Sequence, residues 1–128
     1  MVKKVLFITS NQGVEHDELT EPLNFLKSKG FEVIHAAEKN EDVATVKGDT
    51  KAATQYTPDT SFDHVDLNDY DLLVIPGGTV NADTLRINQD AQKIIQHFAD
   101  NHKPIAAICH GPWTLIDAQR IKDKNLTS

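Results

Sequence analysis

Short runs dominated by apolar residues alternate with amphipathic stretches along most of this chain of 128 residues. Runs of strand type cover Val5–Ile8, Phe31–Ala36 and Asp71–Ile75, and another begins at Pro104 and ends at Cys109. Such runs are typical of strands that are buried on both faces of a parallel sheet. The pattern therefore predicts a mostly parallel sheet with helices packed against it.

Two of the intervening stretches have apolar residues at helical spacing. In the first stretch these residues are Leu19, Leu23 and Leu26. Gly30 ends that predicted helix, and Pro22 must lie in its first turn or kink it. The second stretch, Asp90–Asn101, has one apolar face. Because strands and helices alternate, the sequence predicts one doubly wound α/β domain over residues 1–128.

The segment 38–68 is more polar than the rest and contains turn signals at 48–50 and 58–60. Val43–Val46 and Ala52–Tyr56 flank the first of these turns, so we expect them to form a small hairpin beside the main sheet. No repeat, low-complexity tract or linker divides the sequence.

Composition and charge limit the classes of protein to consider. The formal net charge is −6 and the pI is about 5.4, which argues against a nucleic-acid partner because phosphate contacts need clustered Lys and Arg. No stretch approaches the roughly 20 apolar residues of a membrane-spanning helix. A single cysteine cannot form an internal disulfide, which favours a reducing, cytoplasmic location. The six histidines lack metal-ligand spacing, so we expect no metal or other cofactor.

Cys109, the only cysteine, follows the last apolar run and precedes a helix-start signal at Gly111-Pro112. Open α/β sheets place ligands and reacting groups at the carboxyl ends of their strands. The amino end of the following helix would present unpaired N–H groups and a partial positive charge, which favour the thiolate. A lone cysteine is often a small buried core residue, but this position between strand and helix favours a nucleophile.

Residues beside Cys109 and on the same predicted edge of the sheet offer partners for the thiol. His110 is a candidate base if the sharp strand-to-helix turn at Cys109, the elbow, directs its imidazole towards the thiol. Its backbone N–H could donate to an oxyanion. The alternative is that His110 only packs beside the site. Gly111 allows a tight elbow. Gly77 and Gly78 follow a neighbouring strand, and Gly78 is a candidate second oxyanion donor, although Pro-Gly-Gly also forms plain turns.

The acidic group Glu15-His16-Asp17-Glu18 follows the first strand on that same edge. Acidic residues at a helix start commonly do no more than interact favourably with the helix dipole. An ionised carboxylate near Cys109 would raise the pKa of the thiol, whereas a protonated acid would donate a hydrogen bond to the thiolate and lower it. A contact between the cysteine and one of these acids therefore requires an acid whose pKa is raised by burial.

Three segments together resemble the DJ-one/PfpI superfamily, and within it the PfpI-type stress proteins. They are GVEHDELTEP at 13–22, VIPGG at 74–78 and AAICHGP at 106–112. The resemblance covers essentially the whole chain and implies a flavodoxin-like α/β/α sandwich, similar to that of class I glutamine amidotransferases. Family domains extend further, with more strands and a final helix, so the resemblance also implies that this domain is truncated at its C-terminus.

The resemblance assigns a role to each candidate residue. Cys109 matches the family nucleophile, and His110 matches the histidine beside it. Glu18 matches the glutamate that hydrogen-bonds the thiol, and Glu15 matches a second acid nearby. The oxyanion donors match the backbone of Gly78 and His110.

The resemblance also implies a homodimer or a higher homo-oligomer. In protease-like members an acidic residue from a neighbouring subunit completes a Cys-His-acid triad. Asp83 is the best match for that acid, in a loop that is one residue longer than in the archaeal proteases.

The resemblance leaves three functions open. The first is a cysteine-dependent enzyme of the glyoxalase or deglycase type, acting on reactive carbonyls such as methylglyoxal or on early glycation adducts. The second is an intracellular peptidase or amidase that uses Asp83 in trans. The third is a redox sensor or chaperone in which Cys109 oxidises to sulfinic acid. A glutamine amidotransferase would need a histidine and a glutamate after the cysteine, and no such pair follows His110.

Overall fold

The computed structural model describes residues 3–48 and 51–108, which form two sheets and three α-helices. The larger sheet is parallel and contains, in spatial order, β6 Thr60–Ser61, β3 Glu32–Ala37, β1 Lys4–Thr9, β7 Leu72–Ile75 and β8 Ile105–Ala107. The smaller sheet contains β2 Gln12–Glu15, β4 Val43–Lys47 and β5 Lys51–Tyr56. The helices are α1 His16–Ser28, α2 Thr79–Ile87 and α3 Gln89–Asp100, with 3₁₀ turns at Phe62–His64 and Leu67–Asp69. This architecture confirms the predicted fold class.

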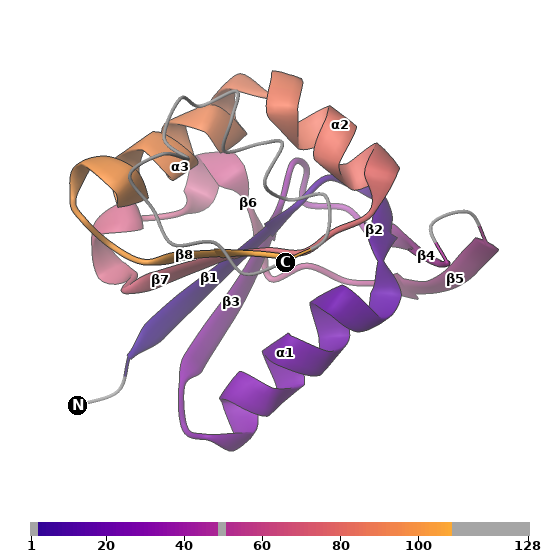
Figure 1. The fold of residues 1–128 in the computed structure, drawn as a ribbon, viewed down its shortest axis with the longest axis horizontal. Helices are drawn as coiled ribbons and strands as arrows, with labels where there is room; N and C mark the ends of the chain where they lie inside the picture. The colour runs from indigo at the N-terminus through magenta and orange to yellow at the C-terminus, as the bar shows by residue number, and fades with distance from the viewer. Residues whose placement is uncertain (1–2, 49–50, 109–128) are drawn as a thin grey trace.

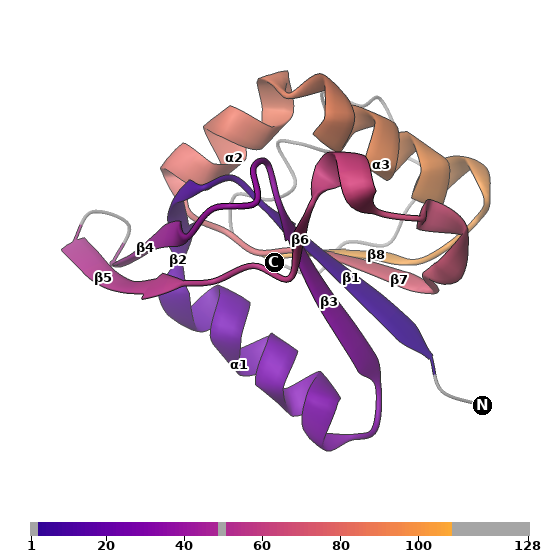
Figure 2. The same ribbon diagram turned by 180° about the vertical axis from the view of Figure 1, so that it is seen from behind.

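The helices cover both faces of the larger sheet (Figure 1). Helix α1 lies on one face, and α2 and α3 lie on the other. The reverse view shows the smaller sheet beside the end of β1 from which β2 continues (Figure 2). None of the helices in residues 3–48 and 51–108 is long and apolar enough to cross a membrane.

Strand β1 is the centre of the fold because its side chains are buried on both faces of the sheet. Val5 and Phe7 pack in the cluster on the α1 side, and Leu6 and Ile8 pack in the cluster on the α2 and α3 side. This is the burial that the continuous apolar run predicts. Because β1, β7 and β8 are parallel neighbours, their carboxyl ends meet at one edge of the sheet.

Helix α1 buries Leu19 and Leu23, as its leucine spacing predicts. Pro22 lies inside the helix, beyond the first turn. Since proline has no N–H, it cannot donate the helical hydrogen bond that the Glu18 carbonyl would otherwise receive. Gly30 ends the helix with a φ of 90°, a conformation that glycine adopts without steric cost.

Strands β2 and β6 and helix α2 were not predicted. The expected hairpin forms as β4 and β5, but β2 joins it in parallel and completes a separate sheet. Helix α2 occupies the segment that was expected to be a loop around Asp83, so that expectation was wrong. The buried residues of α2 are Asn81, Ala82 and Leu85.

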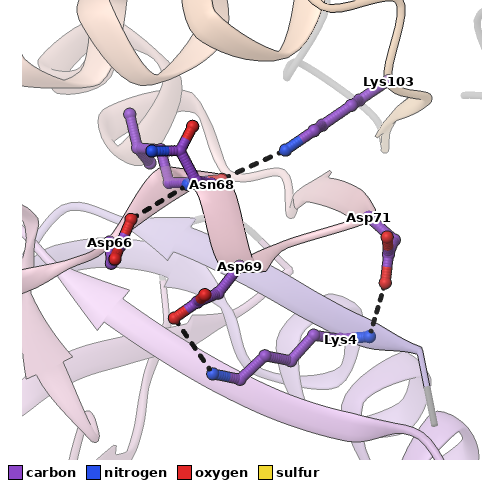
Figure 3. A network of polar contacts seen from close by, with 7 residues as sticks. Lys4, Asp66, Asn68, Asp69, Asp71 and Lys103 are labelled. Atoms are coloured by element: carbon purple, nitrogen blue, oxygen red, sulfur yellow. Dashed lines mark hydrogen bonds and ion pairs between the residues drawn. The ribbon is translucent and has the colours of Figure 1, made fainter.

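The amino ends of the strands carry a polar network of their own (Figure 3). The Lys4 N–H donates to Asp71 Oδ2 at 3.0 Å, and Lys4 Nζ lies 3.7 Å from Asp69 Oδ2. Lys103 Nζ donates to the Leu67 carbonyl at 3.2 Å. These contacts join β1, the second 3₁₀ turn and the approach to β8 at the edge opposite to the candidate site.

Candidate active site

The first turn of α1 is joined to the turn after β7. Glu18 Oε1 accepts the Gly77 N–H at 2.9 Å, and the Glu15 N–H donates to the Gly77 carbonyl at 3.1 Å. Both polar groups of the Gly77 backbone are therefore held from the α1 side. The structure thus brings together Glu15, Glu18, Gly77 and Gly78, which the order of strands and helices predicts at one edge.

Gly78 precedes α2 with a φ of 105°, a conformation that favours glycine. A Cβ added to Gly78 would lie 2.2 Å from the Gly13 carbonyl oxygen, so a side chain also lacks space there. Gly13 has a φ of 88°, and a Cβ added to it would lie 2.5 Å from the Val80 Cβ. Strand β2, which contains Gly13, and the start of α2 can approach this closely only because glycine occupies both positions.

Strand β8 leads to this edge beside β7. The Ile108 N–H donates to the Ile75 carbonyl at 3.0 Å, so backbone pairing with β7 continues to the residue before Cys109. Cys109, His110 and Gly111 lie outside the described residues, as do the helix expected after them and the expected C-terminal truncation. The nucleophile, base and elbow therefore stay predictions.

A cavity of about 400 Å³ opens between α1 and the end of β8. The described residues that line it are Asp17, Glu18, Glu21, Pro22, Phe25 and Ile108. Glu18 and Ile108 thus face the same space, although they come from segments 90 positions apart. The Phe25 side chain, 59% exposed, provides an apolar wall, and Asp17 and Glu21 give the cavity negative charge.

Asp83 lies on the outer side of α2. Its side chain is 56% exposed, and its Oδ1 is 4.0 Å from Arg86 Nη1. Asp83 is not among the described residues that line the cavity beside Glu18. Within the described part of one chain, Asp83 and Glu18 therefore belong to different surfaces.

Sequence reasoning missed one buried polar residue near this edge. Asn81, on the first turn of α2, is fully buried and hydrogen-bonds both Ser10 and Pro76. The sequence gives only an indirect signal for Asn81, namely its partner Ser10, which directly follows a buried strand. Polar residues at that position often line a site. In the described ranges no three His, Cys, Asp or Glu side chains are grouped so that they could hold a metal ion.

The fold and this edge define a flavodoxin-like α/β protein with a glutamate–glycine contact at the carboxyl ends of its parallel strands. A sequence model of the DJ-1/PfpI family matches residues 3–128, and the chain belongs to that family. Deglycase PfpI of Pyrococcus furiosus is 36% identical over 98% of the chain and 71% of its own length. Putative cysteine protease YraA of Bacillus subtilis is 33% identical over 99% of the chain and 72% of its own length.

A solved structure shows the same fold. Drosophila melanogaster DJ-1beta superposes with a TM-score of 0.84 at 26% sequence identity, covering 93% of the chain. The chain spans 61% of the length of that protein. Since the names of the two sequence relatives denote enzymes, the family has a deglycase-like or protease-like character.

Proposed function

We propose that the chain is a cysteine-dependent enzyme that acts on reactive carbonyls such as methylglyoxal or on early glycation adducts. The observation that carries this proposal is the hydrogen bond from the Gly77 N–H to Glu18 Oε1, in a cavity that also contains Ile108. It sets a carboxyl group beside the chain segment that continues into Cys109. The deglycase names of several relatives support the same assignment.

The reaction on methylglyoxal needs no oxidant. The Cys109 thiolate adds to the aldehyde carbon, and the former carbonyl oxygen takes a proton to give a hemithioacetal. A proton then moves from that carbon to the adjacent ketone carbon, while the proton of the new hydroxyl group is transferred to the ketone oxygen, which yields a lactoyl thioester. Water cleaves the C–S bond, releases lactate and restores the thiol.

Glu18 serves as the proton carrier in this proposal. Its Oε1 accepts a backbone N–H, so the proton of the acid form belongs on Oε2. From Oε2 it would donate to the Cys109 thiolate and later to the substrate oxygen. The Gly77 contact therefore supports Oε2 as the acidic oxygen of Glu18 in this proposal.

The Gly78 and His110 N–H groups would hold the oxyanion that forms when the thiolate attacks. Gly78 lies at the amino end of α2, where the helix dipole also favours negative charge. His110 supplies the second donor and, through its imidazole, an alternative base. We further propose that residues 1–128 act as one domain within a cytoplasmic homo-oligomer.

The test is the formation of lactate from methylglyoxal by the purified chain. Wild type should form lactate, and Cys109→Ser should reduce the rate to the uncatalysed background. Equal rates for the two proteins would exclude the thiol mechanism. A second arm uses a purified methylglyoxal–arginine adduct with an excess of a free-aldehyde trap, because only true adduct cleavage persists when the released aldehyde is trapped.

Peptide hydrolysis is the second candidate, and the position of Asp83 favours it. An exposed carboxylate on α2, outside the cavity of its own chain, is available to a second subunit. In that arrangement Asp83 would orient His110 of the neighbouring subunit as the general base. Mixing the variants Asp83→Ala and Cys109→Ser separates this arrangement from a site within one chain, because only a site formed in trans regains activity.

A further inference from the structure

The Asn81 side chain bridges the ends of two neighbouring strands. Its Oδ1 accepts the Ser10 N–H at 2.8 Å and the Ser10 hydroxyl at 3.0 Å. Its Nδ2 donates to the Pro76 carbonyl at 3.1 Å. Ser10 directly follows β1, and Pro76 directly follows β7, so one fully buried amide joins both strand ends.

This bridge lies where the strand order of the sheet reverses. From β1 the chain crosses to β3 on one side, and from β7 it crosses to β8 on the other. In the register between β1 and β7, Val5 is paired with Leu72 and Phe7 is paired with Val74. Open α/β sheets generally have a crevice at such a point. Here the Asn81 amide connects its two sides by hydrogen bonds.

The bridge also completes the support of the Pro76–Gly78 turn. Gly77 is held by Glu18 and Glu15 from the α1 side. The Pro76 carbonyl is held by Asn81 from the α2 side. Three consecutive polar groups of this turn, Pro76 O, Gly77 N and Gly77 O, are thus fixed before the chain reaches Gly78.

We propose that Asn81 is a positioning residue that sets the Pro76–Gly78 turn and, through it, the direction of the Gly78 N–H. The part of this inference that concerns oxyanion binding rests on the proposed function. An asparagine suits the position because one planar amide supplies both the acceptor that Ser10 needs and the donor that Pro76 needs. Alanine would leave the buried Ser10 N–H without that acceptor and the Pro76 carbonyl without that donor.

The experiment compares wild type, Asn81→Ala and the control Ile95→Ala. Ile95 is equally buried but lies in α3, so its truncation lowers stability without removing a contact to the turn. The first readout is the ¹⁵N–¹H spectrum, in which Gly77 and Gly78 report on the turn and Gly30 and Gly48 serve as internal references. We expect Asn81→Ala to shift Gly77 and Gly78 and to leave the references in place, and Ile95→Ala to shift none of the four.

The second readout is steady-state kinetics with methylglyoxal, well below the Tm of every variant. Asn81→Ala should lower kcat about tenfold or more and change KM by less than about twofold, because a misdirected donor weakens binding of the transition state. Ile95→Ala should stay within about threefold of wild type. Unchanged Gly77 and Gly78 shifts, or an unchanged kcat in Asn81→Ala, would overturn the proposal.

The two proposals fail in different ways. If wild type forms no lactate, the proposed function fails, and the glycine shifts alone decide whether Asn81 positions the turn. If wild type is active but Asn81→Ala equals it, the function stands and the role of Asn81 falls. Should Asn81→Ala not fold, Asn81→Ser is assessed by the same two criteria, since its short hydroxyl cannot bridge Ser10 and Pro76 together.

Discussion

Gly78 and Gly13 face each other so closely that a Cβ on Gly78 would lie 2.2 Å from the Gly13 carbonyl oxygen. The same glycine has a φ of 105°. Two independent constraints, backbone conformation and lack of space, therefore act on one residue. Gly30 shows only the first of them, because it has a φ of 90° but no atom within 4 Å of an added Cβ.

Replacement of these two glycines by alanine separates the constraints. Gly30→Ala should lower the free energy of unfolding by about 1 kcal/mol, which is the cost of a left-handed conformation in a residue with a Cβ. Gly78→Ala should lower it by more than about 3 kcal/mol, because the turn and β2 must also move apart. Urea denaturation measures both values. Equal losses in the two variants would show that the close approach to Gly13 costs nothing.

Glu18→Gln should separate the support of the thiolate from proton transfer. The glutamine oxygen can still accept the Gly77 N–H, and its NH₂ group can donate to a thiolate, but it cannot carry a proton between atoms. We expect the pKa of the Cys109 thiol to stay within about 0.5 of wild type, while kcat with methylglyoxal falls about a hundredfold or more. The pH dependence of alkylation by iodoacetamide gives the thiol pKa.

The matched control is Glu32→Gln, the same chemical change at the amino end of β3. It should leave both the thiol pKa and kcat as in wild type. A glutamine at position 18 that retains full kcat would exclude Glu18 as the proton carrier. A thiol pKa that instead rises to the ordinary value near 8.5 would show that only the acid form of Glu18 supports the thiolate.

His35 should make the stability of the fold dependent on pH. Its ring is fully buried, its Nε2 lies 2.8 Å from Thr9 Oγ1, and burial lowers its pKa from 6.5 to about 4. Since the unfolded chain binds this proton more readily, stability is complete above about pH 6.5 and is lost as the pH falls towards 4. Between pH 7.5 and 4.5 the loss due to His35 should be about 2 to 3 kcal/mol.

Two variants isolate that contribution. His35→Gln removes the titrating group, so its free energy of unfolding should fall by about 2 to 3 kcal/mol less than that of wild type over the same pH range. His64→Gln removes an exposed imidazole and should follow the wild-type curve. Parallel curves for wild type and His35→Gln would show that His35 is not held in its neutral form.

Mixing two inactive variants tests whether Asp83 acts across a subunit boundary. In the peptidase hypothesis, Asp83→Ala and Cys109→Ser should each be inactive towards a peptide substrate. If the triad forms in trans, a mixed dimer has one complete site, so random reassortment in equal amounts should restore about a quarter of the wild-type activity. A site contained in one chain would give no recovery. Peptidase activity that persists in Asp83→Ala alone would exclude a role for this acid.

The strands β1, β3, β7 and β8 of the main sheet could be predicted because they are apolar runs that are largely buried. Val5–Ile8 has apolar residues on both sides, and such runs have few alternative structures. Helix α2 could not be predicted, because one of its buried residues is polar and two of its apolar residues are exposed. Asn81 is fully buried, whereas Val80 is 47% exposed and Ile87 is 81% exposed. A pattern read from apolar residues alone therefore misses the face of α2 that contacts the sheet.

The candidate site was predictable in part for a similar physical reason. Parallel strands end at one edge, so the order of strands and helices was enough to group Glu18 with Gly77. The Glu18–Gly77 hydrogen bond itself depends on how α1 is placed relative to β7, and no local pattern encodes that placement. The role of Asn81 depends on Ser10, which is 71 positions away in the sequence, as well as on the nearby Pro76. Cys109, His110 and Gly111 stay predictions.

The charge of the cavity beside Glu18 bears on the release of product. Beside Glu18, its described walls include the carboxyl groups of Asp17 and Glu21. A neutral aldehyde can enter such a space without electrostatic cost, but a reaction that yields a carboxylate creates an anion among like charges, which repel it. Lactate would therefore be a weak competitor for the cavity, and added salt would strengthen its inhibition by screening this repulsion.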